Sequence, residues 1–149
     1  IPPMRYQRHY HPEVKTGLRG KFAINYVVAL AFLDGKLEID TFTDAKANEP
    51  EVQNALSKVK VIVDDTIPEP GPYCPVSVEL KDGRRFTYTA RIAKGHPQNP
   101  MTEEEVLNKF RSNAKSVISE EQSAELVQDV QHLETIGNVR KLIELLVHK

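Results

Sequence analysis

The sequence has a single cysteine, no tryptophan and no long apolar run. One cysteine excludes an internal disulfide and favours a reducing compartment, so we expect a cytoplasmic protein. Cys74 has no evident base beside it, and we interpret it as a structural thiol rather than a nucleophile. The longest nearly unbroken apolar run, 26–33, is far shorter than the roughly 18 residues that a membrane-spanning helix needs. A net charge of −1 gives no bulk attraction to nucleic acid or anionic membranes, so neither is an expected partner.

What is present is the composition of a globular chain. Its 149 residues are 40% apolar and 28% charged, which is enough to bury a core without disulfides or metals. The chain opens Ile1-Pro2-Pro3 without a methionine, and we expect it to be the carboxy-terminal part of a longer protein. Catalytic groups absent here would then lie upstream.

Positive charge is concentrated in residues 1–21, which carry a formal +4 against −5 for the remainder. Three prolines and two glycines exclude a long helix there, and we expect an ordered loop. Because Arg and His bind carboxylates and phosphates, the segment is either a solvated basic arm or a loop that faces a small polyanion. The candidate binding residues are Arg5, Arg8, His9, His11, Arg19 and Lys21.

Helical spacing appears first in the 21–33 segment, which is apolar on every side and is expected to be enclosed by neighbouring elements. Asp34-Gly35 should stop this helix. A second helix is predicted over 50–59, with Pro50 in the first turn and Asn48 or Glu49 as its cap.

Alternating apolar residues then predict an antiparallel sheet of three strands, at 59–63, 76–80 and 86–90. Asp82-Gly83 joins the last two strands and is a strong hairpin signal. The proline-rich segment 67–75 is predicted to be an extended connector. Together these elements indicate an α+β fold.

Prolines and a glycine in 95–100 predict a domain boundary before a helical end of the chain. Two capping boxes, Thr102 with Glu105 and Ser119 with Gln122, begin two helices, and a third follows Gly137-Asn138. All three carry apolar stripes that must be buried, so we expect them to dock on a larger helical body outside this chain.

Histidines offer two further hypotheses. In an extended chain His9 and His11 would share one face as a metal pair, but no third ligand stands at useful spacing, so no metal is expected. His96 lies at the predicted boundary, where it would face an interdomain cleft or serve as a structural turn residue.

No phosphate loop, nucleophile elbow, cysteine zinc site or dinucleotide fingerprint is present, so the residues alone do not define a mechanism. Tyr6, Tyr10 and Tyr26 are candidate phenols that would donate a hydrogen bond to a carboxylate or carry a proton. The alternative for each is a packed aromatic side chain.

Five motifs follow one another along the chain: GKFAINY at 20–26, FLDG at 32–35, FTD at 42–44, VELKDGR at 78–84, and GHPQNPMT at 95–102 followed by Lys109-Phe110. In this order they resemble signatures of the MmgE/PrpD family. Ala23 stands where that family often has Ser.

The resemblance implies an α+β lid domain over 1–98, and helices over 99–149 that return to an all-helical domain. Members such as 2-methylcitrate dehydratase, cis-aconitate decarboxylase and iminodisuccinate epimerase work on small di- or tricarboxylates by proton transfer, without metal or other cofactor. The match of residues 1–6 implies that Tyr6, on a lid strand, faces the cleft as a catalytic residue. We expect the full-length protein to be a hydro-lyase and a dimer, and we expect this chain alone to be inactive. Decarboxylation and epimerisation are the alternative reactions. A non-catalytic module for anion binding or assembly is the alternative kind of protein.

Overall fold

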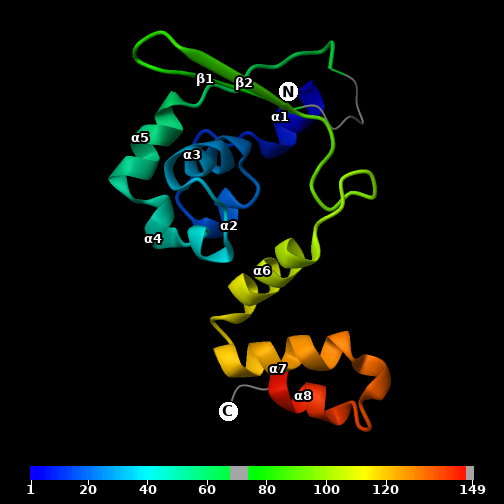
Figure 1. Cartoon of the computed structure of the whole chain (residues 1–149). Coiled ribbons are helices and arrows are strands. Elements are labelled where there is room, and N and C mark those ends of the chain that lie inside the picture. The colour runs from blue at the N-terminus through cyan, green and yellow to red at the C-terminus, as the bar shows by residue number, and fades with distance from the viewer. Residues whose placement is uncertain (68–73, 147–149) are drawn as a thin grey trace. The chain divides into compact units, whose positions relative to one another are not determined.

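A computed structural model describes residues 1–67 and 74–146. The chain divides into two compact units, Ile1–Pro100 and Met101–Lys149. The described residues contain helices and one antiparallel pair of strands, which confirms the α+β class. Most of the predicted connector at 67–75 lies outside the described residues. The elements of the first unit (Figure 1) are α1 (Pro3–His9), α2 (Gly17–Gly20), α3 (Ile24–Asp34), η1 (Ile39–Thr41), α4 (Asp44–Ala47), α5 (Pro50–Lys58), β1 (Cys74–Glu79) and β2 (Arg85–Ala90).

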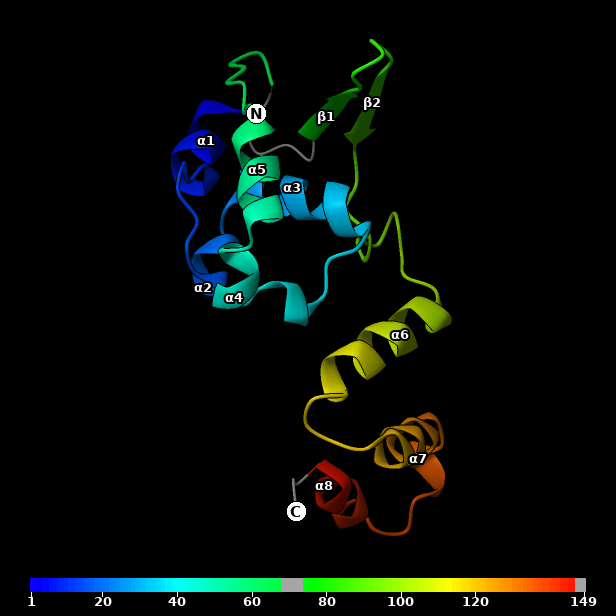
Figure 2. The ribbon, with the colours of Figure 1, turned by 90° about the vertical axis from the view of Figure 1, so that its left-hand side faces the viewer.

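Helix α3 carries the centre of the first unit's core. It ends as predicted at Gly35, whose φ of 69° is the left-handed conformation that glycine adopts at helix ends. Tyr26 and Leu30 on α3 are fully buried against the apolar side of α5, where Val52 and Leu56 are buried. Figure 2 shows α5 lying across α3. Helix α5 begins after Glu49, one of the two caps that the sequence predicts.

The core covers only one side of α3. Phe32 is 63% exposed, and Ala31 beside it is also exposed. The prediction that neighbours enclose this helix on every side is therefore wrong for the described residues. The reason is that the apolar residues of α5 and of the preceding loops all pack against the face that carries Tyr26 and Leu30.

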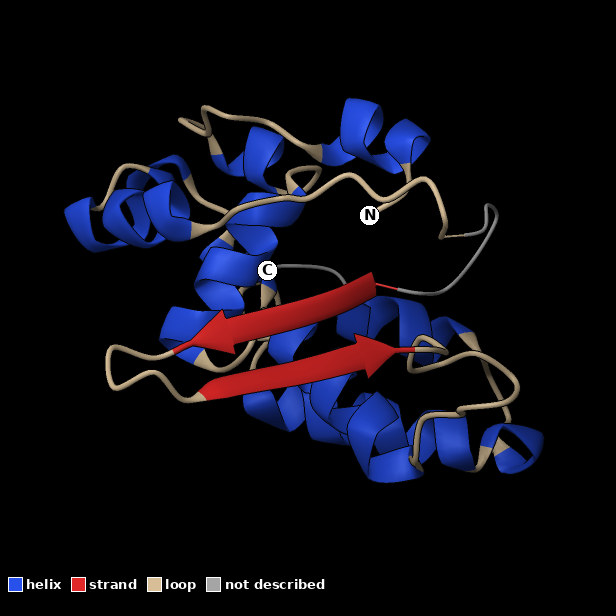
Figure 3. Ribbon diagram, turned by 90° about the horizontal axis from the view of Figure 1, so that it is seen from above, coloured by secondary structure: helices blue, strands red, loops and turns tan. Residues whose placement is uncertain are grey.

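The strands β1 and β2 form the predicted hairpin, with Val76 opposite Tyr88 and Glu79 opposite Arg85. Gly83 adopts a φ of 85° in the turn, where a side chain would be strained. Figure 3 shows the two strands running in opposite directions. The strand predicted at 59–63 does not form, because this segment belongs to no sheet among the described residues. The Val59 amide donates to Leu56 at the end of α5, and Ile1 bonds to the backbone of Ile62 and Asp64.

Over its described residues, 101–146, the second unit contains the three predicted helices and a 3-10 turn. Both capping boxes form: the Thr102 hydroxyl accepts from the Glu105 amide, and the Ser119 hydroxyl accepts from the Gln122 amide. In return, the Glu105 side chain accepts from the Thr102 amide and the Gln122 side chain accepts from the Ser119 amide. The elements are α6 (Glu103–Ala114), α7 (Glu120–Gln131), η2 (Leu133–Thr135) and α8 (Arg140–Leu146).

Few apolar residues of this unit are buried. Ile118 and Leu126 are buried, and Phe110, Val127 and Leu142 are partly buried, whereas six further apolar residues of these helices and their turns are more than half exposed. The exposed members are Val106, Val117, Val130, Val139, Ile143 and Leu146. No helix among the described residues is long and apolar enough to span a membrane.

Candidate anion-binding site

Helix α1 holds Tyr6, the sequence-predicted catalytic residue. Pro3 starts the helix, since a proline in the first turn sacrifices no helical hydrogen bond, and the Tyr6 amide donates to the Pro2 carbonyl at 3.1 Å. The four-residue spacing stacks the rings of Tyr6 and Tyr10, with centroids 4.8 Å apart. The strand that the resemblance implies for Tyr6 is wrong, and so is the ordered loop expected from the prolines and glycines, because residues 3–9 form a short helix that Pro3 begins.

The two histidines next to this helix differ in setting. His9 is the last residue of α1 and is exposed, while His11 lies beyond the helix end and is half-buried. The extended His9-Tyr10-His11 arrangement on which a metal pair depends does not form. In the described part of the chain no three His, Cys, Asp or Glu side chains are grouped to hold a metal ion.

Asn25 of α3 fixes the backbone of His11. The Asn25 side-chain nitrogen donates to the His11 carbonyl at 2.7 Å, and its oxygen accepts from the His11 amide at 3.4 Å. Asn25 is 2% exposed, so these bonds satisfy a buried polar side chain that would otherwise cost free energy. The pair joins the cationic segment to the core, and no local sequence pattern predicts it.

Helix α2 supplies the next cation, Arg19. Thr16 caps the helix by accepting from the Arg19 amide at 3.2 Å, and the Gly17 amide donates to Asp44 at 2.8 Å. Gly20 packs so closely on the buried Tyr26 that an added Cβ would lie 2.5 Å from the ring. These contacts set the position of α2 and hence the origin of the Arg19 side chain.

The positive charges of this region act on one another. Partial burial of the imidazole is the largest cause that lowers the pKa of His11, and the charges of Arg19 and His9 lower it further. Cationic groups from α1 and α2 therefore lie within electrostatic reach of His11. Such a cluster suits the binding of a small anion, because one anion relieves the repulsion among all three groups.

The remaining candidate residues are less tightly placed. Arg5 is half-buried on α1, whereas Arg8 and Lys21 are exposed. His96 is exposed and its Nδ1 accepts from the Gln98 amide at 3.1 Å, a contact typical of a turn histidine. A role for these residues in substrate binding stays a prediction.

Tyr26 is a core residue. Its ring is fully buried, its hydroxyl donates to the Thr41 carbonyl at 3.3 Å, and burial raises the pKa of its phenol. Of the three candidate phenols, Tyr6 and Tyr10 remain partly accessible.

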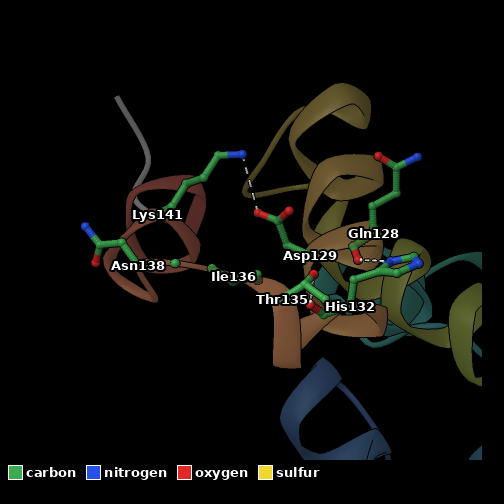
Figure 4. A pocket seen from close by; sticks show the side chains of 8 residues that line it. Gln128, Asp129, His132, Thr135, Ile136, Asn138 and Lys141 are labelled. Carbon is green, nitrogen blue, oxygen red and sulfur yellow. Dashed lines mark hydrogen bonds and ion pairs between the residues drawn. The ribbon is translucent and has the colours of Figure 1, made fainter.

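A polar depression in the second unit was not anticipated from the sequence (Figure 4). Lys141 lies between Glu125 at 2.7 Å and Asp129 at 3.7 Å, and the His132 ring contacts the Gln128 carbonyl at 2.9 Å. Glycine and asparagine at 137–138 form the turn beside it. One lysine between two carboxylates leaves this group with a formal charge of −1, so the depression does not suit an anion.

Fold and surface together define an α+β protein whose first unit holds a cationic segment in a fixed conformation. Comparison with known proteins identifies the family. Residues 5–134 match the MmgE/PrpD C-terminal domain, and the chain belongs to this family.

Several curated relatives of the chain carry the name cis-aconitate decarboxylase. It is 31% identical to cis-aconitate decarboxylase of Mus musculus and 32% identical to that of Homo sapiens, in each case over 98% of this chain and 30% of the relative. It is 26% identical to cis-aconitate decarboxylase of Aspergillus terreus over 88% of this chain and 28% of that relative. The chain thus spans about three tenths of the length of these relatives.

Proposed function

We propose that this chain is part of a lyase that acts on a small polycarboxylate of the cis-aconitate class. The observation that carries the proposal is the cationic cluster of His9, His11 and Arg19, attached to the core through Asn25. Three relatives that match nearly the whole chain or most of it are named cis-aconitate decarboxylases, which supports a tricarboxylate as the anion.

The chemistry assigns separate tasks to these groups. In a decarboxylation the carbon–carboxylate bond breaks, CO2 leaves, and the electron pair left behind takes up a proton. Cations hold the carboxylates that do not leave, and a phenol such as that of Tyr6 donates a hydrogen bond or a proton. The names of the relatives favour decarboxylation over the dehydration that the sequence places first, with epimerisation as a further outcome of related proton chemistry.

We further propose that a helical domain outside these 149 residues completes the site and covers the second unit. The exposed apolar residues of α6, α7 and α8 support this, since helical stripes of this kind are stable when buried. A cytoplasmic homodimer, with no nucleic acid or membrane as partner, is part of the same proposal.

Assay of the full-length protein against a panel of acids tests this function. We expect turnover of cis-aconitate or a close tricarboxylate, no turnover by the 149-residue chain alone, and a KM raised tenfold or more by Arg19→Gln. Arg91→Gln removes an exposed arginine outside the cationic segment and is the matched control. Absence of turnover with every acid of the panel would refute the proposal.

The competing hypothesis is a non-catalytic module that binds small anions or assists assembly. It predicts that the full-length protein binds a tricarboxylate without consuming it. Substrate consumption and equilibrium binding, measured on the same preparation, separate the two hypotheses.

A further inference from the structure

His11 differs from the other cationic residues in two respects. Its backbone is hydrogen-bonded to a core residue, and two other cationic side chains lie near it. Asn25 bonds both backbone groups of His11, so the core fixes the position of this residue, which remains partly exposed. Arg19 is brought to the same part of the unit, because the next residue, Gly20, packs on the ring of Tyr26, the chain neighbour of Asn25. His9 lies two residues before His11 at the end of α1, and the charges of His9 and Arg19 both lower the pKa of His11. The packed element α3 contributes the neutral Asn25.

The positive charge of this cluster is unbalanced within the described part of the chain. No carboxylate there forms an ion pair with His9, His11 or Arg19, although ion pairs form elsewhere on the same unit, as between Lys46 and Glu49 at 3.0 Å. An unliganded cluster of this kind favours the neutral form of its weakest base, which is an imidazole. A bound polyanion reverses that preference because it supplies the missing negative charge.

We propose that His11 is a proton-linked binding residue: it contacts a carboxylate of the substrate as an imidazolium, so that binding of the polycarboxylate takes up a proton. This inference rests on the proposed function and assigns a residue to the affinity of that site. Only an anion with several carboxylates can neutralise His11 together with Arg19, so proton uptake should also favour tricarboxylates over monocarboxylates.

Thermodynamic linkage fixes the size of the effect. When only the protonated form binds, the apparent Kd is the intrinsic Kd divided by the protonated fraction. The free pKa of His11 lies below 6.5, so this fraction falls about tenfold between pH 7.5 and pH 8.5. The carboxylates of the ligand are ionised throughout that range and do not add to the change.

Titration calorimetry on the full-length protein tests the inference with propane-1,2,3-tricarboxylate, which lacks the double bond of cis-aconitate. Measurement at pH 7.5 in two buffers of different ionisation enthalpy gives the number of protons taken up. We expect uptake approaching one proton for the unmodified protein and close to none for His11→Gln. His132→Gln, which removes an exposed histidine of the second unit, is the control and should retain the uptake.

The possible failures are distinguishable. Binding without proton uptake, or uptake that persists in His11→Gln, would overturn the role of His11 and leave the proposed function intact. Failure to bind the tricarboxylate, together with no turnover of any acid, would overturn the proposed function itself. Misfolding of His11→Gln is not expected, because Asn25 contacts the backbone of residue 11 and not its ring; we would confirm this by circular dichroism.

Discussion

Replacement of Gly17 by alanine should push α2 away from the backbone of Phe42 and Thr43, against which it packs. A Cβ at this position would overlap the Phe42 carbonyl and lie 2.7 Å from the Thr43 nitrogen. Both neighbours are backbone atoms, so no side chain can rotate away to relieve the overlap. Helix α2 must therefore move, and its movement should break the hydrogen bond from the Gly17 amide to Asp44, which is 2.8 Å long.

The expected cost follows from these contacts. Overpacking of a close interface usually costs about 1–3 kcal/mol, and loss of a hydrogen bond to a charged group adds to it, so we expect a loss of roughly 2–4 kcal/mol. For a unit of about 100 residues, each kcal/mol lowers Tm by roughly 4–8 °C. Gly17→Ala should therefore melt roughly 8 °C or more below the unmodified protein.

Thermal unfolding followed by circular dichroism measures this difference. Gly137→Ala is the matched control: it adds the same methyl group at a glycine with nothing within 4 Å of the new atom, and it should change Tm little. Equal melting temperatures for Gly17→Ala and Gly137→Ala would refute the close approach of α2 to Phe42. Movement of α2 should also displace Arg19, so the anion affinity of Gly17→Ala should fall even where the protein is folded.

Three further outcomes are expected. Tyr6→Phe in the full-length enzyme should lower kcat/KM by about 1–3 kcal/mol of transition-state stabilisation with no loss of folding stability; unchanged kinetics would remove Tyr6 from the site. Because the folded pKa of His11 is lowered, stability should decline as the pH falls below 6.5 and level off below the folded pKa; His11→Gln should flatten this part of the pH profile in urea titrations. Ser119→Ala should cost about 1 kcal/mol by removing the cap of α7, measurable as a lower denaturation midpoint, whereas an unchanged midpoint would show that the cap contributes nothing.

The parts of the fold that the sequence predicted are those whose signals are local. Gly35 ends α3, Asp82-Gly83 makes the hairpin turn, and two capping boxes begin α6 and α7 at the expected residues. In each case the hydrogen bond or backbone angle involves residues within a few positions of one another. Side-chain type and spacing are then sufficient evidence.

The errors arise where a segment depends on distant partners. Alternation at 59–63 is compatible with a strand, but a strand also needs a neighbour along its length. Here Ile62 is 75% exposed, and within the described part of the chain Ile1 is the only distant residue whose backbone bonds to this segment. Helix α1 was missed for a different reason. A proline breaks the interior of a helix but is a favourable first residue, and Pro3 occupies that first position in α1.

The candidate site depends both on local sequence signals and on contacts between distant residues. Its cations are visible in the sequence as an excess of positive charge, yet the charge count alone gives Lys21 the same weight as Arg19. What distinguishes them is the path of the backbone: the cap from Thr16 and the close packing of Gly20 on Tyr26 fix α2, and Asn25 fixes His11. Specific binding requires charges at fixed distances, because a mobile cation loses conformational entropy when it meets its ligand. The buried amide of Asn25, which carries no charge and resembles any other polar residue in a helix, is therefore the residue through which the core contributes to anion affinity.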